Sequence, residues 1–191
     1  MLDTLLKMDQ FLLLTLNGGL PGGFFEVFMV LLSEKLLWLG VYLGALGWAY
    51  WRKQPHLVFT LLGLAIAVGV SDWLCAYLLK PYFGRLRPCH ELRQLIEFRG
   101  CGGLYSFPSN HAANGMAGAA FLMVHGYSKA ARYLFVAVLF VALSRVYLGV
   151  HFPADVFFGM YVGLFISVCL GMLMRKQILK VSQKSRLRNL A

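Results

Sequence analysis

The chain has 191 residues, of which 59% are hydrophobic, and its mean hydropathy is +0.67. This composition is too apolar for an ordinary soluble domain and indicates a single integral membrane domain over residues 1–191. A formal net charge of +10 would suit a nucleic-acid-binding protein, but the positive residues are scattered over loops and the C-terminal tail. We therefore expect the lipid bilayer and an anionic lipid headgroup as partners, and no nucleic acid.

The first 35 residues have a mixed pattern. Residues 1–16 interleave Leu and Phe with charged residues such as Asp9, which predicts an amphipathic helix in the membrane interface. Glycines and a proline in residues 17–23 end this helix. Residues 24–33 are too short to cross a bilayer alone, so the sequence leaves open whether residues 1–35 contain a sixth span.

Five apolar segments follow, each near the roughly 20 residues that a helix needs to cross a bilayer. The predicted spans are residues 36–51, 57–79, 112–127, 131–149 and 155–174. Because lipid offers the backbone no hydrogen-bond partners, these spans must be helices. The predicted fold is all-α: a polytopic transmembrane bundle of five to six spans (36–174), preceded by an N-terminal region (1–35).

The short loops predict the orientation of this bundle. Arg52 and Lys53 lie between the first two spans, Lys129 and Arg132 between the third and fourth, and a basic tail occupies residues 175–191. By the positive-inside rule this side is cytoplasmic, including the C-terminus. The other loops then face the periplasm or the exterior.

Three short polar segments interrupt the apolar pattern, at residues 80–88, 108–111 and 144–155. They contain three fixed cations, two histidines, a serine and a carboxylate. These residues are Lys80, Arg87, Arg145, His111, His151, Ser109 and Asp155. Such a set can hold a phosphate group and transfer it through a histidine, and the apolar setting suggests a lipid phosphate.

The cations and the serine have ordinary explanations as well. A guanidinium matches phosphate oxygens and is always charged, and Arg145 lies in an apolar run where it must face a polar group. Lys80 taken alone also fits a side chain that snorkels to headgroups. Ser109 is expected to cap a helix beginning near His111, where unpaired N–H groups favour an anion.

His151 and Asp155 lie four residues apart with Pro153 between them, which predicts that Pro153 opens the last helix. A carboxylate in the first turn can orient an imidazole and stabilise its cationic form. The alternative is that Asp155 only caps the helix and His151 is a loop residue.

The order and spacing of the three segments resemble the tripartite signature of the type-2 phosphatidic acid phosphatase superfamily, which is also similar to vanadium haloperoxidases and glucose-6-phosphatase. The matching residues are Lys80, Arg87 and Pro88; then Pro108, Ser109 and His111; then Ser144, Arg145, His151 and Asp155. Asn110 departs from the signature, because the family has glycine there.

The resemblance implies that His151 is a nucleophile that forms a phosphohistidine, that Asp155 orients it, and that His111 is the general acid and base. The phosphate oxygens would be held by Lys80, Arg87, Arg145, Ser109 and the Asn110 backbone. No cofactor is expected. Two histidines can contribute to a zinc site, but a third ligand is hard to find beside three cations, so we expect no metal.

Other polar residues have supporting roles in this hypothesis. Asp72, inside the second span, is expected to pair with a site arginine. Ser144 is expected to support the residues of the site without contacting the phosphate itself. Cys89 and Cys101 flank the outer loop, where we expect a disulfide; the alternative is two free thiols.

The resulting hypothesis is a lipid phosphatase of the bacterial cytoplasmic membrane. Its candidate substrates are a polyprenyl diphosphate, phosphatidylglycerol phosphate, phosphatidic acid and a lipid A-type glycolipid. The alternatives are a lipid phosphotransferase, in which a second lipid takes the phosphate, and a non-catalytic lipid-binding protein or transporter. The oligomeric state stays open.

Overall fold

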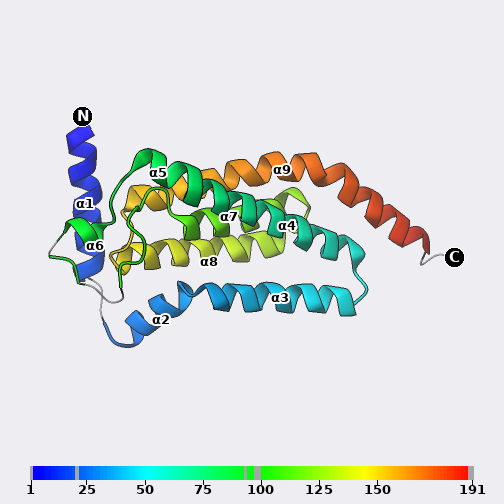
Figure 1. The fold of residues 1–191 in the computed structure, drawn as a ribbon. Coiled ribbons are helices and arrows are strands. Elements are labelled where there is room, and N and C mark those ends of the chain that lie inside the picture. The colour runs from blue at the N-terminus through cyan, green and yellow to red at the C-terminus, as the bar shows by residue number, and fades with distance from the viewer. Residues whose placement is uncertain (1, 20–21, 93, 97–99, 189–191) are drawn as a thin grey trace.

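The computed structural model describes residues 2–19, 22–92, 94–96 and 100–188 (Figure 1). The described regular structure is helical apart from one isolated β-bridge, which confirms the predicted all-α class. The elements are α1 (Leu2–Gly19), α2 (Phe24–Leu32), α3 (Lys35–Trp51), α4 (Pro55–Trp73), the π-helix η1 (Leu74–Leu79), α5 (Lys80–Phe83), α6 (Pro88–Glu91), α7 (Asn110–Val124), α8 (Ser128–Tyr147) and α9 (Pro153–Arg188).

Three helical stretches are long and apolar enough to cross a membrane: Pro55–Phe83, Ser128–Tyr147 and Pro153–Lys180. The helices α3 and α7 have 17 and 15 residues, fewer than the roughly 20 of a typical span. Within the described ranges, no helix before Lys35 is both long and apolar enough to cross a membrane. Length and composition thus support three spans where the sequence predicted five to six.

Local sequence signals explain several helix boundaries. Prolines occupy the first turns of α4 and α9, as predicted for Pro153. The helix from Pro55 continues through η1 into α5, and Gly84 ends it with a left-handed φ of 58°. Helix α9 continues past the predicted span end at residue 174 to Arg188, so most of the predicted basic tail extends this helix. Residues 189–191 of that tail lie outside the described part of the chain.

Helix α7 lies in the middle of the bundle, among α4, α8 and α9 (Figure 1). Its buried face is rich in alanine, for example Ala112, Ala113 and Ala117. Glycines of α9 face it so closely that a Cβ built on Gly159 would lie 2.5 Å from the Ser109 carbonyl oxygen. The small residues therefore let the backbones of α7 and α9 touch.

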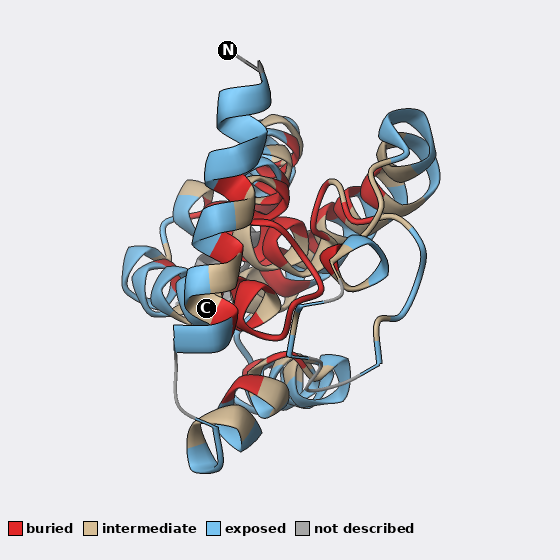
Figure 2. Cartoon of the chain, turned by 90° about the vertical axis from the view of Figure 1, so that its left-hand side faces the viewer, coloured by how far each residue is buried: buried red, intermediate tan, exposed pale blue. Residues whose placement is uncertain are grey.

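Helix α1 crosses the end of the bundle instead of running along it (Figures 1 and 2). Asp9, Leu13 and Asn17, spaced four residues apart, form its buried face. Leu13 packs in a cluster with Val146 and Phe152, which belong to the end of α8 and the turn before α9.

The three polar segments lie at the end of the bundle that α1 crosses. This end holds α5, α6, the start of α7 and the α8–α9 turn, whereas the α3–α4 turn and the C-terminus of α9 lie at the opposite end (Figure 1). The fold therefore brings the predicted site segments to one end of the bundle.

Candidate active site

The first and second polar segments are joined by a loop that folds back on itself. Leu86 and Tyr105 form the isolated antiparallel bridge, and the Ser106 amide donates to the Arg85 carbonyl at 2.7 Å. Lys80 Nζ donates to the carbonyls of Tyr105 and Ser106 at 3.2 and 2.8 Å. Lys80 thus anchors the returning segment of the loop while bringing its charge to the site.

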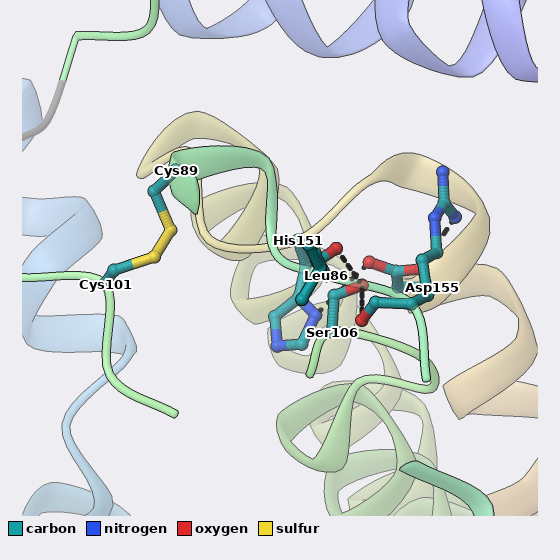
Figure 3. The surroundings of a disulfide bond; sticks show 7 residues. Leu86, Cys89, Cys101, Ser106, His151 and Asp155 are labelled. Atoms are coloured by element: carbon teal, nitrogen blue, oxygen red, sulfur yellow. Dashed lines mark hydrogen bonds and ion pairs between the residues drawn. A yellow bond between two sulfur atoms is a disulfide. The ribbon is translucent and has the colours of Figure 1, made fainter. Parts of the chain in front are cut away.

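A disulfide between Cys89 and Cys101 closes the same loop, with a Cα–Cα distance of 5.9 Å. The predicted disulfide is confirmed, and the alternative of two free thiols is wrong. In the view of Figure 3 it lies to the left of His151, with Asp155 to the right. It constrains the backbone that carries Arg87, whose amide donates to a loop carbonyl at 3.1 Å.

His151 and Asp155 form the predicted pair in the α8–α9 turn and the first turn of α9 (Figure 3). The two residues are only 2% and 0% exposed, and His151 Nδ1 lies 3.5 Å from Asp155 Oδ2. The same oxygen accepts the Phe152 N–H at 2.9 Å, whereas the nearby Ser106 hydroxyl donates to the Leu86 carbonyl at 2.9 Å. The His151 amide donates to the Arg145 carbonyl at 3.3 Å, which ties the pair to the end of α8. Because Nδ1 faces Asp155, Nε2 is the ring nitrogen available to a substrate.

The predicted cations surround His151. Burial, followed by the positive charges of Lys80, Arg145 and Arg87, lowers the pKa of His151 well below its ordinary value; His111 acts in the same direction. His151 is therefore neutral near pH 7, which is the form that a nucleophile requires. Across the described residues, no group of three His, Cys, Asp or Glu side chains is arranged to hold a metal ion.

His111 lies in the first turn of α7 and meets a segment that sequence reasoning missed. Its Nε2 is 3.1 Å from the carbonyl oxygen of Ser33, the residue that ends α2. The Ser33 hydroxyl in turn contacts the Ser144 hydroxyl at 2.8 Å. The charge of Lys35, at the start of α3, also acts on His111. The α2–α3 junction therefore forms one side of the site.

Ser109 holds the N-cap position of α7, as predicted, but its side chain makes no capping hydrogen bond. Among the residues described, its buried hydroxyl has no partner, and neither does Arg87 Nε. The Ser109 amide donates to the Asp155 carbonyl at 2.9 Å. A hydroxyl, a guanidinium N–H and the start of a helix are thus left for an anion near Asp155.

Asp72 binds amides where the sequence predicted an arginine. Its Oδ1 accepts from Asn110 Nδ2 at 2.9 Å and from Asn114 Nδ2 at 2.8 Å. Asn110, which replaces the signature glycine, also donates Nδ2 to the Asp72 carbonyl at 3.1 Å, so its side chain points toward α4. Asp72 and the two amides therefore tie the start of α7 to α4.

Two further charged residues are linked to the His151–Asp155 pair: Arg85 contacts Asp155 directly, and Asp9 contacts Arg85. Arg85 Nη1 donates to Asp155 Oδ1 at 2.8 Å, and Arg85 Nη2 donates to Asp9 Oδ2 at 2.7 Å. The Arg85 guanidinium also lies 3.9 Å above the Phe152 ring. The sequence carried a partial signal, since Asp9 shares a helix face with Leu13; nothing local distinguished Arg85 from other loop cations.

Residues 56–178 match the family model described as PAP2 superfamily. Two known proteins named lipid A 4'-phosphatase are similar to most of the chain. The one from Porphyromonas gingivalis is 29% identical over 173 residues, covering 86% of this chain and 72% of the relative. The one from Bacteroides thetaiotaomicron is 31% identical over 176 residues, covering 85% of this chain and 75% of the relative.

Two crystal structures have a similar fold. LpxE of Aquifex aeolicus superposes with a TM-score of 0.65 at 20% identity, covering 85% of this chain and 94% of LpxE. A PAP2-type phosphatidylglycerolphosphate phosphatase from Bacillus subtilis superposes with a TM-score of 0.69 at 23% identity, covering 91% of this chain and 88% of that protein. At these identities the likeness concerns the fold alone.

Proposed function

The chain belongs to the PAP2 superfamily and is a membrane lipid phosphatase, and we propose that it removes a phosphate group from a lipid A-type glycolipid through a phosphohistidine intermediate. The substrate class is supported by two relatives named lipid A 4'-phosphatase that align with 86% and 85% of the chain. A polyprenyl diphosphate, phosphatidylglycerol phosphate and phosphatidic acid are the competing substrates.

The first chemical step in this proposal is attack by His151 Nε2 on phosphorus. The P–N bond forms while the bond to the leaving oxygen breaks, and the electron pair goes to that oxygen, which takes a proton from the cationic form of His111. The negative charge of the bound phosphate favours this protonated form of His111. Asp155, 3.5 Å from Nδ1, stabilises the cationic imidazole that results. In the second step, water gives a proton to His111 and displaces His151, which releases inorganic phosphate.

The phosphoryl oxygens would be held by Lys80, Arg87 and Arg145, with the Ser109 hydroxyl as an additional donor. Phosphoryl transfer gains most from positioning and charge neutralisation, and three fixed cations supply both. No step of this scheme requires a metal ion.

One observation carries the proposal: a buried imidazole that is neutral, backed by a carboxylate and surrounded by cations. A transporter or a non-catalytic lipid-binding protein needs the cations but gains nothing from burying a histidine against a carboxylate. The arrangement therefore favours catalysis over binding alone.

The membrane placement proposed here has five crossing helices, with α1 in the interface. Helices α3 and α7 reach only about 25 and 22 Å at 1.5 Å per residue, but both run beside longer apolar helices. Arg52 and Lys53 in the α3–α4 turn, with Lys129 and Arg132 near the α7–α8 turn, favour a cytoplasmic location for that end. The site would then face the periplasm or exterior of a bacterial cytoplasmic membrane.

The test is phosphate release from purified protein in detergent, with the four candidate lipids as parallel substrates. We expect release from the lipid A-type glycolipid, an acid-labile phosphoenzyme when the phosphate is radiolabelled, and loss of both in His151→Ala. The matched control is His90→Ala, which removes an exposed histidine of α6 and should leave release unchanged.

Several outcomes would contradict the proposal. Preference for another candidate lipid would overturn the substrate class, and full activity of His151→Ala would overturn the nucleophile. Label that moves to a second lipid instead of appearing as free phosphate would identify the chain as a phosphotransferase.

A further inference from the structure

We propose that Asp9, on the N-terminal helix, is a positioning residue: it holds Arg85 so that Arg85 holds Asp155 in place beside His151. This inference rests on the proposed role of His151 as nucleophile. It gives α1 a part in the reaction, although this helix precedes all three polar segments and lies outside residues 56–178, which match the family.

The contacts form a continuous chain of ionisable groups that ends at His151. Asp9 Oδ2 accepts from Arg85 Nη2 at 2.7 Å, Arg85 Nη1 donates to Asp155 Oδ1 at 2.8 Å, and Asp155 Oδ2 lies 3.5 Å from His151 Nδ1. The side chains of Asp9 and Asp155 are 9% and 0% exposed, and that of Arg85 is 21% exposed. Ion pairs shielded to this degree are screened little by solvent or salt.

Asp9 has a second contact at the start of α9. Its Oδ1 accepts the Ala154 N–H at 2.8 Å, directly before Asp155 in the sequence. One carboxylate of α1 therefore binds both the guanidinium that contacts Asp155 and the backbone that carries Asp155. Because its two oxygens bind two different donors, the orientation of the Asp9 carboxylate is fixed.

The docking of α1 is precise because its neighbouring buried residues are also satisfied. Asn17 Nδ2 donates to the carbonyls of Ile96 and Tyr147 at 3.0 and 2.8 Å, and Asn17 Oδ1 accepts the Ile96 N–H at 2.9 Å. Leu13 is fully buried between Asp9 and Asn17 along the same face. The position of Asp9 is therefore set by the fold of α1 and not by Arg85 alone.

Sharing Arg85 between two carboxylates has a consequence for His151. Asp9 takes up part of the guanidinium charge, so Asp155 keeps negative charge to stabilise the imidazole as it becomes cationic during attack. The positive charges of Lys80, Arg87 and Arg145, which also act on His151, disfavour its cationic form. Without the Asp9 charge, Arg85 would neutralise Asp155 more fully, and its guanidinium would lose one of its two anchors.

The test is Asp9→Asn, which keeps an oxygen for the Ala154 amide and removes the charge facing Arg85. We expect kcat for the lipid phosphate to fall about tenfold and KM to change less than about twofold, because the substrate contacts stay intact. Orthovanadate, which mimics the pentacoordinate phosphorus of the transition state and bonds to the nucleophile, should inhibit about tenfold less well. Inhibition by inorganic phosphate, which needs only the cations, should be unchanged. Asp9→Glu, which keeps the carboxylate, should retain most of kcat.

Two control variants separate this role from a structural one. Asp3→Asn removes the same charge from an exposed position of α1 and should match the wild type in every assay. Asn17→Ala loosens the docking of α1 without touching Arg85, so it should lower the melting temperature more than Asp9→Asn does, with a smaller loss of vanadate affinity.

The results are decisive in each direction. A wild-type protein that neither hydrolyses lipid phosphates nor binds vanadate would defeat the proposed function. An active wild type with Asp9→Asn equal to Asp3→Asn would overturn the role of Asp9. If Asn17→Ala lost as much vanadate affinity as Asp9→Asn, Asp9 would serve only to dock the helix, and the inference would again be wrong.

Discussion

Replacing Gly159 with alanine tests how strongly the site depends on the contact between α7 and α9. Gly159 lies in α9, four residues after Asp155, and its missing Cβ would sit 2.5 Å from the carbonyl oxygen of Ser109 and 3.2 Å from its amide nitrogen. Ser109 holds the N-cap position of α7 and donates its amide to the Asp155 carbonyl. The added methyl group therefore meets backbone that belongs to the site.

The size of the effect follows from these distances. An ordinary contact begins at 3.4 Å, so the helices must separate locally by about 0.9 Å to accommodate the methyl group. A displacement of about 1 Å between reacting groups costs about 100-fold in rate, and overpacking of this kind costs about 1–3 kcal/mol of stability. We expect Gly159→Ala to fold, to melt at a lower temperature and to lose about 100-fold in kcat.

The assay is phosphate release with kcat and KM measured separately, beside a thermal melt of the same preparation. Gly171→Ala is the matched control, because its Cβ would meet a side-chain methyl of Val124 at 3.0 Å, far along α9 from the site. That side chain can yield, so we expect a small loss of stability and normal kcat. If folded Gly159→Ala kept kcat within threefold of the wild type, the claim that this contact aligns the site would be refuted.

Two further predictions concern the histidine and the loop. Because burial and nearby cations lower the pKa of His151, its neutral form persists as the pH falls below 6.5. Between pH 7.5 and 5.5, kcat/KM should therefore fall no more than the ionisation of the substrate phosphate explains; an additional acid limb near 6.5 would contradict this. Replacing both Cys89 and Cys101 with serine should lower Tm by about 6–12 °C, whereas Cys169→Ser, which removes a free thiol, should not; equal melting of the two variants would count against a stabilising disulfide.

Local signals in the sequence predicted much of the site. Pro153 opens α9 as expected, because a proline at the first turn of a helix loses no hydrogen bond. The spacing of His151 and Asp155 placed the imidazole and carboxylate together, because His151 lies in the turn directly before the helix whose first turn holds Asp155. The cysteines at both ends of one outer loop paired as predicted. These features depend on residues close in sequence.

Features that depend on distant contacts could not be predicted. Asp72 was expected to meet an arginine, but Asn110 and Asn114 lie opposite it because α7 packs beside α4. The contact of Ser33 with His111 joins residues 78 positions apart. The apolar pattern alone also does not decide whether a short helix crosses the membrane. Helices α3 and α7 run beside the longer helices but are shorter than a typical span.

Asp155 shows why the His–Asp spacing alone leaves the site incompletely specified. The spacing brings the carboxylate to the imidazole, but three separate parts of the chain decide its orientation. Ser109, at the start of α7, binds its carbonyl, Arg85 of the outer loop binds its carboxylate, and Asp9 of α1 binds Arg85. A carboxylate that is 0% exposed must have its hydrogen bonds supplied by protein groups, and here they come from the outer loop and from the α8–α9 turn. The burial that keeps His151 neutral therefore requires the loop and the N-terminal helix to close over the same end of the bundle.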